Sequence, residues 1–206
     1  MRWDRATRFY PIIDCDVCAA QGLAPLAVAI GCLKGGARLL QVRAKRGSSA
    51  LFLALADAVV AAAHPFGALV IVNDRPDIAV MSGAGGAHVG QDDLSPDDAR
   101  RVLGNGVLGV STHDPVQVDA ALQSPADYIA VGPVFSTTTK DTGYDARGLD
   151  LLQYAAGRGK PVVAIGGIDL TTAPSVIAAG AAAVAVITDV LRGDPEQRTR
   201  AYLAVL

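Results

Sequence analysis

The stretch LVIVNDRPDIAVMSGAGGAHV, residues 69–89, holds the pattern that decides the fold. It begins with a continuous apolar run at 69–72, passes through the polar turn Asn73-Asp74-Arg75, continues in a helical pattern at 75–82, and ends in a second apolar run at 87–89. Continuous apolar strands are typical of parallel sheets, whose two faces are both covered. The stretch therefore predicts one strand–helix–strand unit with a parallel crossover.

The same alternation extends along the whole chain. Apolar runs typical of strands occur at 9–13, 39–42, 69–72, 87–89, 107–110, 128–131, 162–165 and 183–187. Helical patterns are predicted at about 23–34, 48–64, 75–82, 96–103, 115–123, 148–157, 171–179 and 195–205. Their starts carry typical capping residues, namely Ser48, Ser95, Asp114 and Asp169.

Eight units in 206 residues predict an α/β fold, a single small (β/α)8 TIM barrel spanning 1–206. Each unit has roughly 26 residues, near the lower limit for such barrels. An open doubly wound sheet is the alternative, but the count of eight strands favours closure. The composition shows no linker and no second domain.

Composition excludes several classes of protein. Eighteen basic and 20 acidic residues give a net charge of −2, so a broad basic surface for nucleic acid is not expected. The N-terminus lacks the pattern of a signal peptide, and the longest apolar stretch, 51–63, contains Asp57 and is too short to cross a bilayer. We therefore expect a cytoplasmic protein with small-molecule partners, no nucleic acid and no membrane.

Three cysteines are too few for a disulfide scaffold. Cys15-x-x-Cys18 follows the first strand, where a redox pair, a zinc site or a local disulfide are the conceivable functions. Zinc would need two more ligands, and Cys32 lies inside a predicted helix. A structural role is the favoured interpretation for this pair.

Basic residues follow the second strand. Gln41, Arg43 and Lys45 alternate, so they share one side of an extended segment. Catalytic groups of barrel enzymes gather at the carboxyl ends of the strands. We therefore interpret these residues as an anion-binding set at the mouth of the barrel, with a solvated strand end as the alternative.

Carboxylates follow the next two strands, in Asn73-Asp74 and in Gly90-Gln91-Asp92-Asp93. Adjacent strands would bring one carboxylate from each turn close together. Mg²⁺ prefers one or two protein oxygens with phosphate oxygens and water. Asp74 and Asp93 therefore predict a magnesium site facing a phosphate-bearing substrate, although both could instead cap helices.

The remaining strands are also followed by polar residues or glycines. Ser111 and His113 follow the fifth strand, where a helix-cap cluster is the simpler interpretation and a general acid or base role for His113 is the alternative. His88, within the fourth strand, is expected to be a hydrogen-bonded core residue. The polar loop 132–143 offers hydroxyls and Lys140, and its length suits a mobile lid. Gly166-Gly167 and Thr188 stand where barrels frequently bind phosphate.

Six segments together resemble the thiamine-phosphate synthase family, nearly end to end. They are GARLLQVRAK (36–45), IVND (71–74), GAHVGQDD (86–93), GVSTH (109–113), GPVF with TTTKD (132–135 and 137–141), and IGGI (165–168). The resemblance implies that hydroxymethylpyrimidine diphosphate and thiazole phosphate give thiamine phosphate and pyrophosphate. It also implies a dissociative path, in which diphosphate leaves before the thiazole nitrogen attacks.

The resemblance also implies roles for particular residues. Asp74 and Asp93 match the Mg²⁺ ligands. The diphosphate contacts match Arg43, Lys45, Asn73 and Lys140, while Gln41 and Ser111 match residues around the pyrimidine. The thiazole-phosphate site matches Thr137, Thr139, Gly167, Ile187 and Thr188, with Thr188 standing where the family usually has Ser. The residues expected to act in catalysis are Ser111, Lys140 and Arg43.

Other functions remain as alternatives. A thiazole tautomerase relative shares the barrel but typically lacks the diphosphate and metal set, which this chain keeps. Another phosphate-sugar barrel enzyme would need an acid–base pair at the strand ends, and a non-catalytic binding barrel should have lost part of the set. The sequence is compatible with a homodimer and does not settle the oligomeric state.

Overall fold

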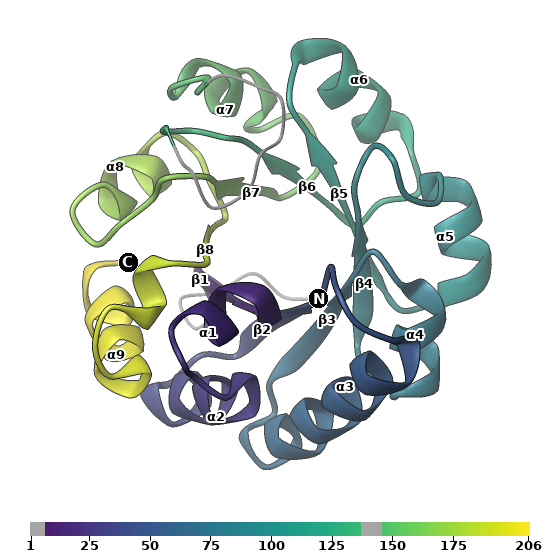
Figure 1. The fold of residues 1–206 in the computed structure, drawn as a ribbon. Helices are drawn as coiled ribbons and strands as arrows, with labels where there is room; N and C mark the ends of the chain where they lie inside the picture. The colour runs from purple at the N-terminus through teal and green to yellow at the C-terminus, as the bar shows by residue number, and fades with distance from the viewer. Residues whose placement is uncertain (1–6, 137–145) are drawn as a thin grey trace.

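Eight parallel strands form a closed barrel in sequence order (Figure 1). The structure is a computed structural model, and it describes residues 7–136 and 146–206. The strands are β1 (Phe9–Asp14), β2 (Leu39–Arg43), β3 (Leu69–Asn73), β4 (Gly86–Val89), β5 (Val107–Thr112), β6 (Tyr128–Val131), β7 (Val162–Ile165) and β8 (Ala183–Val186). Because β1 also pairs with β8, the predicted TIM barrel is confirmed over the open sheet.

An outer ring of helices covers the barrel (Figure 1). The helices are α1 (Cys15–Ala20), α2 (Pro25–Gly35), α3 (Ser49–Ala63), α4 (Pro76–Met81), α5 (Pro96–Leu103), α6 (Pro115–Gln123), α7 (Asp150–Ala155), α8 (Ala173–Ala178) and α9 (Pro195–Val205), with short 3-10 turns η2 (His64–Phe66) and η3 (Asp189–Leu191). The predicted helices are present with ends within about two residues. Helix α1 was not predicted, because six residues are too short to show a helical period.

Helix starts follow the predicted capping chemistry at three of the four positions. The side chains of Ser48, Ser95 and Asp114 each accept a backbone N–H from the first turn of their helix. The prediction for Asp169 is wrong: its carboxylate accepts from Thr171 N and Thr172 N in a turn before α8, and the helix starts after Thr172. A local turn uses the carboxylate before the helix begins.

The buried side chains form two layers. The larger lies between the strands and the helices, and the smaller fills the inside of the barrel. The inner layer contains two tyrosines, Tyr10 and Tyr128, both about 1% exposed, beside aliphatic residues such as Ile71 and Val163. Polar atoms are therefore present deep inside the barrel, directly beneath its mouth.

Helix α3 and the turn that follows it form an apolar helical stretch. Ser49–Phe66 spans 18 residues with a mean hydropathy of 1.6, which is enough by length and composition to cross a membrane. This helical stretch is longer than the apolar run 51–63 seen in the sequence. In the fold, α3 packs against β3 and lies between α2 and α4. It buries Phe52, Ala56 and Val59 against the sheet, as a barrel helix does.

Close packing of α2 on α9 depends on glycine. A Cβ built on Gly35 would lie 2.6 Å from both the Glu196 carbonyl oxygen and Thr199 Cβ. Only a residue without a side chain allows this approach, because the obstacle includes backbone. The contact holds the last helix against the first part of the barrel wall.

Candidate active site

A cavity of about 460 Å³ opens at the carboxyl ends of the strands. Turns after β6, β7 and β8 line it on one side, and the ends of β2, β3 and β5 line it on the other. The predicted site residues that line it are Gln41, Arg43, Asn73, Ser111, Gly167, Ile187 and Thr188. Thr137, Thr139 and Lys140 lie outside the residues that the structure describes.

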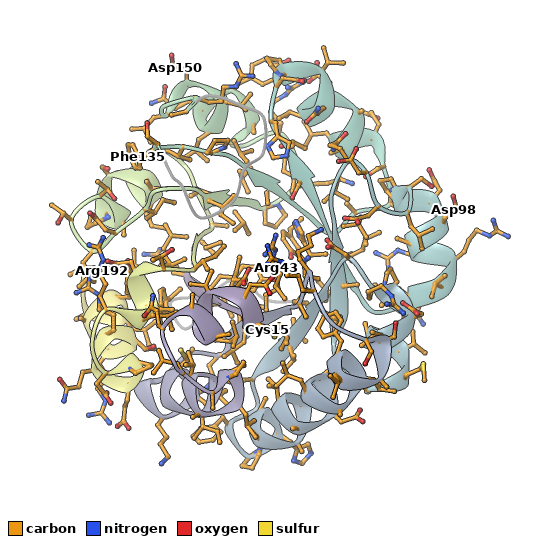
Figure 2. The ribbon with its side chains drawn as sticks, in the orientation of Figure 1. Cys15, Arg43, Asp98, Phe135, Asp150 and Arg192 are labelled. Carbon is orange, nitrogen blue, oxygen red and sulfur yellow. The ribbon has the colours of Figure 1, made fainter. Side chains whose placement is uncertain are left out.

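Arg43 is held by a carboxylate that the sequence analysis did not single out. Asp14 ends β1 directly opposite Arg43 in the strand register, and the two side chains form an ion pair. Asp14 is 2% exposed and also caps α1 by accepting from Asp16 N at 3.0 Å and Val17 N at 3.1 Å. Figure 2 shows Arg43 near the middle of the barrel, beside Cys15 of α1. Asp14 therefore fixes both the helix and the guanidinium.

Asp74 and Asp93 meet beside the cavity, as predicted. Neither begins a helix: the cap positions of α4 and α5 are Arg75 and Ser95. Asp74 has a left-handed backbone, with φ of 63°, and its N–H donates to the His88 carbonyl at 2.7 Å. Asp93 accepts from Gly90 N at 2.7 Å. The turn conformation of Asp74 and the hydrogen bond from Gly90 to Asp93 bring the two carboxyl groups within hydrogen-bond distance of each other, and neither of them caps a helix.

The Asp74 and Asp93 carboxyl groups share a hydrogen bond, and Lys45 forms an ion pair with Asp74. Burial alone would raise the pKa of Asp74, but the Lys45 ammonium, the hydrogen bond with Asp93 and the Arg43 charge lower it below its usual value. Burial and the neighbouring Asp74 carboxylate raise the pKa of Asp93. Two adjacent carboxylates of this kind suit Mg²⁺. Across the described ranges no cluster of three or more His, Cys, Asp or Glu side chains forms, so this pair has no third protein carboxylate.

Five polar side chains form a hydrogen-bonded chain at the floor of the cavity, which Gln41, Tyr10, His88 and Ser111 also line. Gln41 Nε2 donates to Tyr10 Oη at 3.0 Å, and Tyr10 Oη lies 3.1 Å from Tyr128 Oη. Tyr128 Oη lies 3.0 Å from His88 Nδ1, and His88 Nε2 lies 2.8 Å from Ser111 Oγ. The prediction that His88 is a hydrogen-bonded buried residue is confirmed. Its neighbours Tyr10 and Tyr128 were missed, because tyrosine in an apolar run reads as core.

The opposite side of the cavity is shaped by backbone. Gly166 and Gly167 have φ of 102° and 63°. A Cβ on Gly167 would lie 2.6 Å from the Ser136 carbonyl oxygen, so the β7 turn approaches the β6 loop too closely for a side chain. Thr188 directly precedes η3, and Asp189 holds Arg198 in a two-point ion pair at 2.6 and 2.8 Å. This side therefore combines closely approaching backbone and the Thr188 hydroxyl with the charged side chains of Asp169, Asp189 and Arg192.

His113 lies in the wall of the cavity, and the three cysteines of the chain are unpaired with one another. His113 is 8% exposed, lines the cavity, and its Nδ1 lies 2.6 Å from the Gly132 carbonyl oxygen, while the cap residue of α6 is its neighbour Asp114. Cys15, Cys18 and Cys32 are free thiols. Burial raises the pKa of both Cys15 and Cys18 to about 11, which disfavours a reactive thiolate.

Comparison with known proteins identifies the family. A family model described as thiamine monophosphate synthase matches residues 9–190. The chain belongs to the thiamine monophosphate synthase family. It is 43% identical over 203 residues to a thiamine-phosphate synthase of Koribacter versatilis, covering 97% of this chain and 95% of that protein. A thiamine-phosphate synthase of Thermus thermophilus is 44% identical over 172 residues, covering 82% of each.

Solved structures agree with the family. A thiamine phosphate pyrophosphorylase from Pyrococcus furiosus superposes with a TM-score of 0.88 at 26% identity, covering 98% of this chain and 96% of that one. A 3-hexulose-6-phosphate synthase structure has a TM-score of 0.66 at 17% identity, covering 96% of this chain and 99% of that one, which shows the shared barrel alone. The chain is thus an enzyme of the thiamine-phosphate synthase kind, a transferase of thiamine biosynthesis built on a TIM barrel.

Proposed function

We propose that this family member joins hydroxymethylpyrimidine diphosphate to thiazole phosphate, giving thiamine phosphate and pyrophosphate with the help of Mg²⁺. The observation that carries the proposal is the arrangement of groups on two sides of one cavity. Arg43 and Asn73 line a first side, at β2 and β3, with the Lys45–Asp74 ion pair next to them in the chain, and the Gly166-Gly167 turn and Thr188 line a second side, at β7 and β8. The first side suits the diphosphate that leaves during the reaction, and the second side suits the phosphate of the thiazole substrate, which stays attached and holds that substrate in place. We further propose that residues 1–206 act as one catalytic domain in the cytoplasm.

The first side of the cavity would stabilise the departing diphosphate. Arg43 and Lys45 supply positive charge, Asn73 supplies an amide donor, and Lys140 is proposed as a further contact. Asp14 holds the Arg43 guanidinium in place before substrate arrives, so its orientation costs little during the reaction. Asp74 and Asp93 would hold Mg²⁺, which when bound supplies positive charge to the phosphate oxygens of the leaving group.

The pyrimidine would sit between the first side and the polar chain at the floor of the cavity. Gln41 and Ser111 reach the cavity from β2 and β5 and are proposed to hydrogen-bond the pyrimidine. A fixed pyrimidine ring would stabilise the positive charge that develops as diphosphate departs. We therefore propose the dissociative path, with Ser111, Lys140 and Arg43 acting closest to the reacting atoms.

The thiazole phosphate would be anchored on the opposite side. Gly167 brings backbone close to the cavity, Thr188 offers a hydroxyl, and Ile187 offers an apolar surface. Thr137 and Thr139 are proposed to add hydroxyl contacts. With its phosphate held there, the thiazole nitrogen would face the carbon that the diphosphate leaves.

The test is to incubate the protein with both substrates and Mg²⁺ and to follow thiamine phosphate by chromatography. We expect thiamine phosphate to form only when both substrates are present. Isomerisation of the thiazole phosphate without thiamine phosphate would instead identify a tautomerase. Binding of both substrates without any product would identify a non-catalytic barrel.

A further inference from the structure

The hydrogen-bonded chain at the floor of the cavity links strands that are far apart in the sequence. It passes from Gln41 on β2 through Tyr10 on β1, Tyr128 on β6 and His88 on β4 to Ser111 on β5. Its two ends, Gln41 and Ser111, are the residues proposed to contact the pyrimidine. Its three middle members have been given no role in the reaction.

The direction of the chain is set at the Gln41 end. The Gln41 amide nitrogen donates to Tyr10 Oη at 3.0 Å, so the Tyr10 hydroxyl proton needs a different acceptor. Tyr10 is 1% exposed, and Tyr128 Oη, at 3.1 Å, is the other hydrogen-bond neighbour of its hydroxyl among the described residues. The direction that we propose has Tyr10 donating to Tyr128. Burial raises the pKa of both tyrosines far above the usual value, so both keep their protons.

The same direction continues to the Ser111 end. Tyr128 Oη lies 3.0 Å from His88 Nδ1, and in the proposed direction Tyr128 donates to Nδ1, which places the imidazole proton on Nε2. Nε2, at 2.8 Å, then donates to Ser111 Oγ. Ser111 and Gln41 both line the cavity. In this direction of the chain, the Ser111 hydroxyl would offer its proton to a ligand there, and Gln41, whose nitrogen is engaged, would offer Oε1 as an acceptor.

The fold reserves space for this chain. A Cβ built on Gly109 would lie 2.1 Å from Tyr128 Cζ and 2.5 Å from His88 Nδ1. The His88 and Tyr128 rings, whose centroids are 5.6 Å apart, stack in the space that a side chain at 109 would take. Strand β5 therefore carries glycine where the two rings pass.

We propose that Tyr10, Tyr128 and His88 set the hydrogen-bond polarity of the pyrimidine subsite, so that it selects a 4-aminopyrimidine over a 4-oxopyrimidine. This inference rests on the proposed function. An aminopyrimidine donates from its amino group and accepts at the neighbouring ring nitrogen, which matches an acceptor at Gln41 and a donor at Ser111. The oxo analogue accepts at its oxygen and donates from the ring nitrogen, so it meets both partners with the wrong polarity.

The test measures binding, so that it does not depend on turnover. Calorimetry would compare the hydroxymethyl 4-aminopyrimidine with its 4-oxo counterpart, with Mg²⁺ and inorganic pyrophosphate present to fill the diphosphate site. We expect the unsubstituted protein to prefer the amino compound by at least about 30-fold. In Tyr128→Phe, which keeps the ring but breaks the chain, the preference should fall at least about tenfold.

A matched control and a spectroscopic readout separate this role from a purely structural one. Tyr154→Phe alters a tyrosine that is 41% exposed on α7, outside the cavity, and should keep the full preference. The chain has three histidines, so the His88 tautomer can be assigned by ¹⁵N NMR. We expect the proton on Nε2 of the unsubstituted protein. If Tyr128→Phe does not fold, Tyr10→Phe carries the same expectation.

The outcomes distinguish this inference from the proposed function. If the unsubstituted protein binds neither pyrimidine, the proposed function and this inference both fail. If it prefers the amino compound and Tyr128→Phe keeps that preference, the inference fails and the proposed function stands. A proton on His88 Nδ1 overturns the direction of the chain.

Discussion

Asp14→Asn tests how the fold holds the Arg43 guanidinium. Asn keeps an oxygen that can cap α1 but removes the charge, so the change isolates the ion pair from the cap. Asp14 is 2% exposed and Arg43 is 12% exposed, so the variant leaves a largely buried guanidinium without its partner. Removing one partner of a buried pair costs about 3–5 kcal/mol, and the partial exposure of Arg43 reduces our expectation to about 2–3 kcal/mol.

The loss should be visible by calorimetry. For a chain of 206 residues, each kcal/mol shifts the unfolding midpoint by about 2–4 °C, so we expect a decrease of about 4–12 °C. Inorganic pyrophosphate with Mg²⁺ should raise the midpoint less in Asp14→Asn than in the unsubstituted protein, because Arg43 is no longer held in place to meet the anion. Asp119→Asn breaks an exposed ion pair with Arg158 and should change the midpoint little. A midpoint within 1 °C of the unsubstituted protein, or an equal response to pyrophosphate, would refute the reasoning.

Three other predictions follow from single features of the structure. Asp93→Ala should lower the rate of thiamine phosphate formation at least about 100-fold at every Mg²⁺ concentration, because one of the two proposed ligands is lost; unchanged activity and Mg²⁺ dependence in a steady-state assay would remove the metal assignment. Gly35→Ala should destabilise the protein by about 1–3 kcal/mol in urea unfolding, because its Cβ would meet the α9 backbone at 2.6 Å, and an unchanged urea midpoint would contradict that packing. Alkylation of Cys15 by iodoacetamide, followed by mass spectrometry, should accelerate about tenfold per pH unit from pH 7 to 10, because the pKa of its thiol is raised to about 11; a plateau near pH 9 would show an ordinary thiol.

The barrel was predictable because its signal repeats. Continuous apolar runs at the strand positions and helical patterns between them recur in regular order, so an error at one element could not change the architecture. Helix α1 and the turn at Asp169 could not be predicted from these repeating patterns. Six residues are too few for a helical period, and an aspartate before a helix can satisfy either the helix or a preceding turn.

The structure brings together those predicted site residues whose place is set by their position along a strand. Gln41, Arg43 and Ser111 stand at or near the ends of strands, and barrel topology alone brings them to one mouth. Asp14 was missed because its partnership with Arg43 depends on the register of β1 against β2. Tyr10 and Tyr128 were missed because their hydroxyls meet inside the barrel, 118 positions apart in the sequence.

The central claim is that one cavity couples diphosphate departure to thiazole capture. It can be tested most directly by following the complete reaction with ³¹P NMR, with both substrates and Mg²⁺ present. The account predicts that pyrophosphate and thiamine phosphate resonances grow together in equal amounts, and that omission of the thiazole phosphate abolishes thiamine phosphate. Loss of the thiazole phosphate signal without pyrophosphate, or unchanged spectra with folded protein, would contradict the account.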